Sequence, residues 1–454
     1  MKLLSFSASN HRSIRETQTL EFYHNWPHSS SPTNGWSEIT LPVNLLLGAN
    51  ASGKSNLLDA MQFALTAIRL SATSWRDSRP SNRQHHFPFL LDEHSRTNSS
   101  AFEFEFALNE TRYVYGFEWS YEGVQSEWLN RVPAKRWAKC FERNRGETIS
   151  WNKSFISPTE ARELGKVNET ELVLSVGLRN EHEVLSPIAR GLLHNTLFIP
   201  VGSRSQESRV NQLITLIREG KLKIEELSQL MQAADTGIES VKLDQRRIPE
   251  QLIKQVRRLV EVLNDDDPNH STEEQVEGSV EAAKFSDEEL SSLVHTFRFV
   301  HRGSGETREL GLGDESTGTQ SWLATAPAIL EILRNGGVLI ADELDASLHQ
   351  ALIELIINAF SDSTINTKGA QLIFTSHNTN ILEHAQDLNL DPNGFWFAEK
   401  DINGATEVYP LSDFELHPKA NYERRYLGGR YGAIPHVSPS TFRALVNSKK
   451  LQEG

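Results

Sequence analysis

The chain has 454 residues, of which 38% are hydrophobic, enough for one large domain with insertions or for two domains. Its formal net charge of −14 at pH 7 argues against a surface that coats nucleic acid without sequence preference. The single cysteine, Cys140, excludes an intramolecular disulfide and fits a reducing compartment. The sequence starts without a signal-peptide pattern, and no stretch approaches the roughly 18 apolar residues that span a bilayer. We therefore expect a cytoplasmic protein.

Residues 48–55 read Gly-Ala-Asn-Ala-Ser-Gly-Lys-Ser, which is a complete phosphate-binding loop (P-loop). The apolar residues 42–47 predict a buried strand before it, and residues 56–61 predict the start of a helix after it. Strand, glycine-rich loop and helix is the context that separates this motif from an ordinary glycine turn. We expect the loop N–H groups to cradle phosphate oxygens, Lys54 to reach the β- and γ-phosphates, and Ser55 to hold Mg²⁺.

The part of the chain after the P-loop helix predicts short antiparallel strands. Residues 102–106 alternate between apolar and charged side chains, and the strand-like residues 113–119 follow a turn at Asn109 and Glu110. This pattern predicts a β-hairpin. Six basic residues follow within fifteen positions: Arg131, Lys135, Arg136, Lys139, Arg143 and Arg145. We expect them either to contact a DNA backbone or to lie on faces that pack against the head of the protein.

From about residue 157 to residue 290 the pattern becomes helical. Apolar residues recur at helical spacing within 210–217 and 248–263. The three aspartates at 265–267 precede a proline, and the glycine and glutamate of a calcium loop are not spaced correctly after them. We expect a solvated acidic loop there rather than a calcium site.

A second set of chemical groups lies in the last third of the chain. The apolar residues 337–341 predict a strand that ends in Asp342 and Glu343, which can hold Mg²⁺ and polarise an attacking water, respectively. A further apolar strand, residues 371–375, leads to Ser376 and His377, and the histidine can contact a γ-phosphate. Residues 315–320 precede a helix expected to begin near Trp322, which makes them a second candidate phosphate-binding element.

These motifs and their order resemble the ABC-type ATPases of the SMC, RecF and double-strand-break-repair branch. Residues 316–320 are similar to the signature loop of that branch, Asp345 to its D-loop and His377 to its switch histidine. The segment Asn10-His11-Arg12-Ser13-Ile14 looks like an N-terminal element whose arginine lies near the nucleotide, with His11 in place of the usual aromatic residue. The resemblance implies a homodimer, or a higher homo-oligomer, in which two protomers sandwich two ATP molecules. Gln84 and Gln125 are alternative candidates for the Q-loop.

The expected site follows from the motifs and this resemblance together. The catalytic residues are Glu343, His377 and Lys54, and the metal ligands for Mg²⁺ are Ser55 and Asp342. The residues expected to bind ATP are Arg12, Asn50, Ala51, Ser52, Gly53, Lys54, Ser55, Asn56, Ser316, Gly318, Gln320 and Asp345.

Smaller motifs resemble the abortive-infection and restriction-linked, OLD-related ATPases of bacterial anti-phage defence. They are residues 87–91, 115–117 with 127–129, 234–238 and 426–435. This resemblance implies a bacterial ATPase subunit that responds to a phage-derived trigger and works beside a separate nuclease or toxin. The segment after His377 contains no Asp-x-Asp pattern of a fused nuclease, so we expect the effector to be a different chain. Heptads are not sustained, which argues against a long coiled-coil arm.

The expected fold is α/β, an ABC-type P-loop NTPase head with a mixed sheet, flanking helices and an antiparallel β subdomain. We expect the N-terminal half of the head in residues 1–156, a helical insertion in 157–290 and the C-terminal half in 291–454. Two other functions remain open at this stage. One is a RecF- or SMC-like DNA repair ATPase, and the other, disfavoured by the large mixed insertion, is the nucleotide-binding subunit of a transporter.

Overall fold

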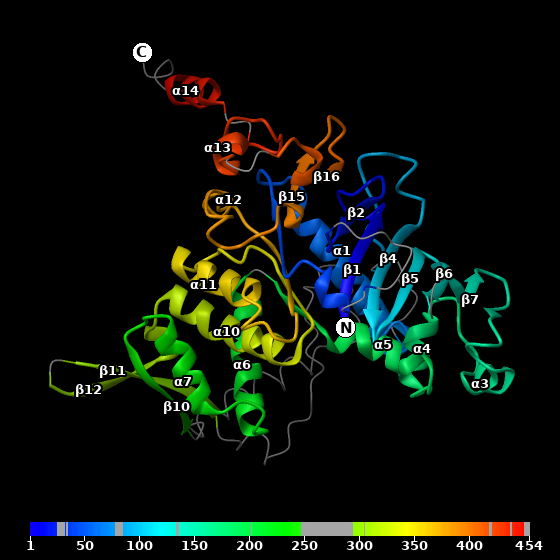
Figure 1. The fold of residues 1–454 in the computed structure, drawn as a ribbon, viewed down its shortest axis with the longest axis horizontal. Helices are drawn as coiled ribbons and strands as arrows, with labels where there is room; N and C mark the ends of the chain where they lie inside the picture. The colour runs from blue at the N-terminus through cyan, green and yellow to red at the C-terminus, as the bar shows by residue number, and fades with distance from the viewer. Residues whose placement is uncertain are drawn as a thin grey trace, which may run out of the picture. The chain divides into compact units, whose positions relative to one another are not determined.

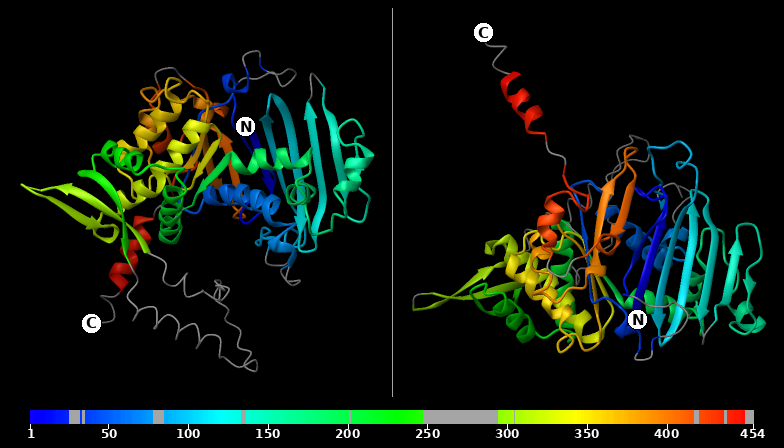
Figure 2. Two further views of the ribbon diagram at one scale, coloured as in Figure 1. Left: turned by 90° about the horizontal axis from the view of Figure 1, so that it is seen from below. Right: turned by 45° about the horizontal axis from the view of Figure 1, so that its top comes forward.

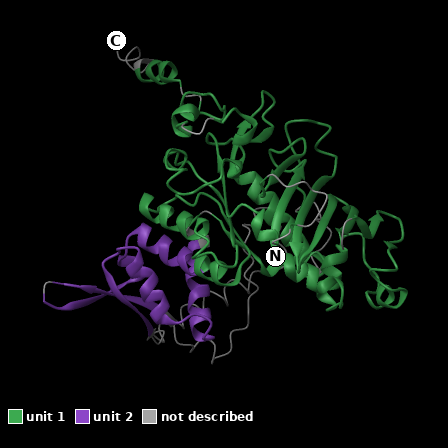
Figure 3. Ribbon diagram, in the orientation of Figure 1, with its two compact units in different colours: residues 1–205, 328–454 green, residues 206–327 purple. Residues whose placement is uncertain are grey.

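The computed structural model describes residues 1–24, 32, 35–77, 85–132, 136–200, 202–246, 294–303, 305–416, 420–435 and 438–448. The chain forms two compact units, which Figure 3 shows in different colours. The first unit contains residues 1–205 and 328–454, and the second contains residues 206–327. No helix in the described ranges is both long and apolar enough to cross a membrane.

A six-stranded sheet in the first unit carries the P-loop strand at its centre. Its order is β16-β15-β3-β14-β13-β9, and all neighbours are parallel except the edge pair β15 and β16. Every residue of β3, β13 and β14 is buried, as expected for parallel strands covered on both faces. The strands are β3 (Val43–Leu47), β9 (Thr196–Ile199), β13 (Val338–Ala341), β14 (Gln371–Thr375), β15 (Phe395–Lys400) and β16 (Thr406–Pro410).

A seven-stranded antiparallel sheet forms the other half of the first unit. Its order is β2-β1-β4-β5-β6-β7-β8, so most strands pair with their neighbours in sequence. Asn109 and Glu110 both have positive φ, 48° and 62°, as the tight turn between β4 and β5 requires. The strands are β1 (Lys2–Ser9), β2 (Gln18–Glu21), β4 (Ser100–Leu108), β5 (Thr111–Ser120), β6 (Gly123–Val132), β7 (Ala138–Asn144) and β8 (Ser150–Trp151).

Helix α1 (Lys54–Leu70) joins the two sheets into one core. It contacts β1 and β4, and its buried face shares a hydrophobic cluster with Leu46, Ile340 and Ile373 of the parallel sheet. Figures 1 and 2 show α1 and α5 beside the antiparallel strands. The other helices of this unit are α2 (Ser74–Asp77), α3 (Pro158–Glu163), α4 (Val173–Arg179), α5 (Leu185–His194), α11 (Gln350–Ser361), α12 (Asn380–Glu383), α13 (Tyr422–Leu427) and α14 (Pro439–Ser448).

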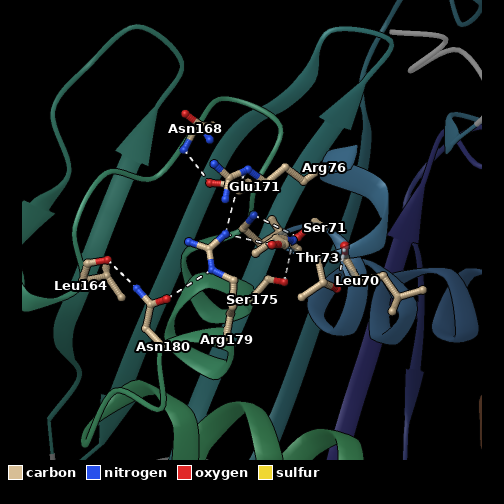
Figure 4. Close-up of polar contacts among 12 residues, drawn as sticks. Leu70, Ser71, Thr73, Arg76, Leu164, Asn168, Glu171, Ser175, Arg179 and Asn180 are labelled. Carbon is tan, nitrogen blue, oxygen red and sulfur yellow. Dashed lines mark hydrogen bonds and ion pairs between the residues drawn. The ribbon is translucent and has the colours of Figure 1, made fainter. Parts of the chain in front are cut away.

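The far end of α1 is anchored by a polar network, which Figure 4 shows. Ser71 Oγ accepts the N–H of Leu172 at 3.1 Å, and Ser175 Oγ accepts the N–H of Ala72 at 3.0 Å. The fully buried carboxylate of Glu171 lies 3.3 Å from the guanidinium groups of both Arg76 and Arg179. Because the charges are paired and the backbone groups have partners, this network fixes the C-terminal end of α1 against α4.

The second unit contains a three-stranded antiparallel sheet and helices. The sheet order is β10-β11-β12, with β10 (Ile238–Arg246), β11 (Val294–Arg302) and β12 (Thr307–Gly311). Helix α7 (Ile224–Ala233) packs against β10. Two helices cross the division between the units, α6 (Ser203–Arg218) near its start and α10 (Thr317–Asn335) at Pro327.

The structure confirms the strand expected before the P-loop, the helix expected after it, the strands expected before Asp342 and before Ser376, and the β-hairpin. The expected domain boundaries at 156 and 290 differ from the observed division, because residues 157–205 belong to the first unit and β9 joins its parallel sheet. Hydrophobic periodicity does not distinguish a helix that covers this sheet from one in a separate unit. The helix expected at 248–263 and the acidic loop that follows lie outside the described residues.

Candidate nucleotide-binding site

The P-loop connects the buried strand β3 to helix α1 and bounds a cavity of about 670 Å³. The cavity is lined by Asn50, Ala51, Ser52, Gly53, Lys54, Ser55, Asn56, Glu343 and His377. Ala51 and Gly53 have positive φ, 62° and 104°, which turns the loop sharply before the helix. The structure therefore brings the predicted loop and two distant predicted residues to one concave site at a helix N-terminus, where an anion is favoured.

Lys54 is a buried cation held by the loop itself. Its side chain donates to the carbonyl oxygens of Gly48 at 2.9 Å and Ala49 at 3.0 Å, and the residue is only 5% exposed. Burial lowers the pKa of Lys54, and the carboxylates of Glu343, Asp342 and Asp345 oppose that shift. A buried ammonium that faces a concave site can be compensated by phosphate.

A hydroxyl and carboxylate cluster lies beside the lysine. Ser55 Oγ donates to Asp342 Oδ1 at 3.0 Å, and Thr375 Oγ1 donates to the same oxygen at 2.7 Å. Thr375 Oγ1 also accepts the backbone N–H of Glu343 at 2.6 Å. Thr375, at the end of β14, thus fixes both carboxylate residues at the end of β13.

The donor set fits Mg²⁺ rather than a softer metal. In the described residues, no three histidine, cysteine, aspartate or glutamate side chains gather as a metal site. Mg²⁺ is usually held by one or two protein oxygens together with substrate phosphates. Ser55 and Asp342 supply oxygen ligands of that kind next to the loop.

Glu343 and His377 are close enough to act on the same part of a ligand. His377 Nε2 lies 3.5 Å from Glu343 Oε1, and the two side chains are 38% and 37% exposed. The backbone N–H of His377 donates to Asp345 Oδ2 at 3.1 Å, so Asp345 orients the histidine segment. Glu343 has a φ of 45°, an uncommon conformation for a non-glycine residue. Such strain is typical of functional sites.

A family model described as "AAA domain, putative AbiEii toxin, Type IV TA system" matches residues 43–171 and 209–383, more than half of the chain. The chain belongs to this family. The matched residues include the P-loop, Asp342, Glu343 and His377, and the match supports an ATPase with an α/β P-loop fold. It confirms the resemblance to ATPases of the abortive-infection kind.

Solved structures similar to this chain include SMC heads, at low sequence identity. The SMC head bound to the C-winged helix domain of ScpA has a TM-score of 0.41 and 14% identity, covering 90% of this chain and 97% of that chain. The SMC head domain from Thermotoga maritima has a TM-score of 0.38 and 12% identity, covering 92% and 100%. An SMC head with coiled coil and joint derived from Pyrococcus yayanosii has a TM-score of 0.36 and 12% identity, covering 94% and 99%. Among curated proteins, the search found no match.

The N-terminal element of this AAA family protein packs next to the P-loop. Arg12 forms an ion pair with Asp59 of α1, and its guanidinium lies 4.9 Å from the ring centroid of Phe87. His11 Nε2 lies 2.7 Å from the same carboxylate, while its ring contacts those of Phe63 and Phe102. The imidazole therefore fills an aromatic position and adds a polar contact. Arg12 does not line the cavity, so its expected ATP contact stays a prediction.

A chain of hydroxyl groups forms hydrogen bonds to the P-loop and to the start of α1. No pattern in the sequence predicted these hydrogen bonds. Ser13 Oγ accepts from Asn56 Nδ2 at 2.6 Å and lies 2.7 Å from Thr406 Oγ1, which donates to the carbonyl of Ser52 at 2.9 Å. A Cβ on Gly53 would collide with Thr406 Oγ1. Only glycine fits there, because of both its φ and this close approach.

The expected signature residues Ser316, Gly318 and Gln320 lie in the second unit. Helix α10 begins at Thr317, not near Trp322 as expected, because Ser316 Oγ accepts the N–H of Thr319 at 3.1 Å and starts the helix earlier. Gln320 Nε2 donates to the carbonyls of Leu312 and Glu315, both at 3.0 Å.

Neither Q-loop candidate gains support from the structure. Gln84 lies outside the described residues. Gln125 is in β6, where its amide donates to Ser120 Oγ at 2.7 Å.

The described members of the basic segment mostly form contacts within the protein. Arg143 lies 3.7 Å from the buried Glu127, Arg145 lies 2.8 Å from Glu169, and Lys139 pairs with Glu142. Arg131 stacks on Phe155 at 4.8 Å. Lys135 lies outside the described residues, and Arg136 is exposed. These contacts favour the structural alternative over DNA contact.

Proposed function

We propose that this chain is the ATP-binding and ATP-hydrolysing subunit of an anti-phage defence system that controls a separate effector. The observation that carries the ATPase assignment is the convergence of Lys54, Glu343 and His377 on one P-loop cavity. The family description, which refers to a toxin and a type IV toxin–antitoxin system, supports the defence role. The effector is then a nuclease or toxin on another chain.

The residues of the cavity suit phosphoryl transfer to water. The loop N–H groups and Lys54 hold the β- and γ-phosphates. Glu343 accepts a proton from the water that attacks the γ-phosphorus, while the bond to the bridging oxygen breaks and ADP leaves with the electron pair. His377, next to Glu343, contacts the γ-phosphate. When bound, Mg²⁺ neutralises phosphate charge, and Ser55 and Asp342 are the residues that would hold it.

A complete site is proposed to need two protomers. Ser316, Gly318 and Gln320 of one protomer close on the γ-phosphate bound to the other, giving a homodimer or a higher homo-oligomer. Ser316→Arg places a bulky cation at the start of α10. It should leave ATP binding at Lys54 intact but abolish ATP-dependent association, measured by light scattering, and turnover. Wild-type turnover by a monomer contradicts this assembly.

The defence role is tested in cells. The gene is expressed together with its genomic neighbour, and phage plating and host growth are measured. We expect phage restriction or growth arrest that Lys54→Ala removes and that Lys153→Ala, a change at an exposed lysine, retains. Equal protection by the Lys54→Ala chain refutes the proposed dependence on ATP.

The alternative of a RecF- or SMC-like DNA repair ATPase makes a different prediction. It requires tight, ATP-dependent binding of duplex DNA by the purified chain. The ion pairs of Arg143 and Arg145 leave these cations little free charge for phosphates. We therefore expect weak duplex binding that does not respond to ATP.

A further inference from the structure

The segment that precedes α10 carries a buried carboxylate next in sequence to the helix start at which the proposed function places an anion. Glu315 comes one residue before Ser316, and its side chain is only 5% exposed. Glu315 Oε1 lies 2.7 Å from Nε2 of His301, which is on β11. This pair lies entirely within the second unit, so its geometry does not depend on the first.

The start of α10 has backbone N–H groups that can bind an acceptor from outside the helix. The first-turn N–H groups of a helix have no partners within the helix. Ser316 Oγ takes the N–H of Thr319, which leaves those of Thr317 and Gly318 for an outside acceptor. A carboxylate and a phosphate are both favoured at such a position. Glu315 is therefore an internal competitor for the place that the γ-phosphate would occupy.

The neighbouring contacts hold the segment but do not restrain the Glu315 carboxylate. Asp314 Oδ2 accepts the N–H of Gly311 at 2.9 Å, and Gln320 binds the carbonyl of Glu315 rather than its side chain. Across the sheet, Ile238 and the exposed Arg308 lie opposite His301 in register. The hydrogen bond from His301 directs the carboxylate toward β11.

We propose that His301 is a positioning residue, which holds the Glu315 carboxylate against β11 and thereby keeps the N-terminus of α10 free for the γ-phosphate of ATP. The inference rests on the proposed ATP-bridged assembly and assigns a regulator to that same site. It also links the three-stranded sheet to the signature segment, because a shift of β11 moves the group that restrains Glu315.

The test compares full-length variants for turnover, for ATP-dependent association and for ATP affinity of the isolated protomer. His301→Leu frees the carboxylate, so kcat and association should fall about 10- to 100-fold, the range that the loss of a hydrogen bond to a charged group allows. ATP affinity at the Lys54 site should not change. The double variant His301→Leu with Glu315→Gln removes the competing charge and should recover most of the lost kcat. Arg302→Leu, which removes a polar side chain at the next and exposed position, should behave as wild type.

The outcomes separate the inference from the proposed function. A wild-type chain that neither hydrolyses ATP nor associates refutes the proposed function. With an active wild type, wild-type turnover by His301→Leu, or a double variant no better than the single one, overturns the inference and leaves the pair a purely structural contact. His301→Gln, which keeps a donor on a polar side chain, is the second variant should His301→Leu fail to fold. We expect its kcat to be at least one third of wild type, and a tenfold or greater loss overturns the inference.

Discussion

Ser55 Oγ lies 3.0 Å from Asp342 Oδ1 although the two residues are 287 positions apart in the chain. The parallel sheet brings them together, because β3 and β13 both end at the same edge with β14 between them. Residues placed at the carboxyl ends of neighbouring parallel strands share one crevice, which is where α/β proteins bind ligands. The two halves of the proposed ATP site are thus positioned by the order of strands.

Glu343→Gln should retain ATP binding and slow hydrolysis by about 10²- to 10⁴-fold, because it removes the proposed acceptor of the water's proton. Steady-state phosphate release and equilibrium nucleotide binding give the two quantities. Glu407→Gln, at an exposed position of β16, is the control. Hydrolysis at the wild-type rate would assign the general base to another residue.

Thr375→Val should reduce kcat by about 10- to 100-fold with a smaller change in ATP affinity. Valine has nearly the shape of threonine but lacks the hydroxyl that joins Asp342 to the backbone of Glu343. Thr375→Ser keeps the hydroxyl and should recover turnover. If Thr375→Ser and Thr375→Val reduce kcat equally, the loss of turnover comes from altered packing at this position and not from the missing hydrogen bonds.

Gly53→Ala should abolish nucleotide binding, whereas Gly146→Ala should not. Both glycines have positive φ, 104° and 76°, so alanine is strained at each by about 1 kcal/mol or more. Only at Gly53 does the added Cβ also collide with Thr406, since nothing lies within 4 Å of a Cβ at Gly146. Nucleotide titration and thermal unfolding of both variants measure the difference. Normal binding by Gly53→Ala would show that the loop can move away from Thr406.

His86 should make the fold sensitive to acid. Burial, and secondarily the charge of His11, lower the pKa of His86 to about 4, and neither ring nitrogen has a partner among the described residues. As the pH falls from about 6.5 to about 4, the unfolded chain takes up a proton that the native state resists, so the free energy of unfolding decreases. His86→Phe should make this decrease shallower in urea unfolding measured at several pH values. His194→Gln, at an exposed histidine, should keep the wild-type slope.

The sequence predicted those parts of the site that lie in short continuous patterns. Residues 48–55, Asp342 with Glu343, and His377 each follow a recognisable apolar strand. The structure places residues 50–55, Glu343 and His377 around one cavity, and Asp342 binds Ser55 beside it. Thr406 has no such pattern, because its importance comes from a hydrogen bond to a loop 354 positions away. The sequence showed Thr375 only as the last residue of a strand, and its partners, Asp342 and Glu343, directly follow the neighbouring strand β13. Long-range pairing of this kind is set by strand order, which local periodicity does not encode.

The domain organisation was harder to predict than the motifs for a related reason. Residues 196–199 form a strand of only four residues between helices, and they join the sheet beside β13. A short apolar run cannot be assigned to a strand or a helix by periodicity alone. The expected helical insertion therefore began too early relative to the observed second unit.

The central place of β3 in the parallel sheet has a consequence for how the protein is made. Its two neighbours, β14 and β15, belong to the last quarter of the chain. Thr406, which donates a hydrogen bond to the carbonyl of Ser52 in the P-loop, follows Ser52 by 354 positions. At synthesis rates of about 5–20 residues per second, the finished P-loop strand leaves the ribosome on the order of tens of seconds before its partners exist. During that interval a strand with four apolar residues out of five has two unpaired edges, which is the condition under which nascent chains aggregate. Assembly of the nucleotide site is therefore a late event in synthesis. The N-terminal half of the nascent chain depends on protection from aggregation until β14 and β15 have been synthesised.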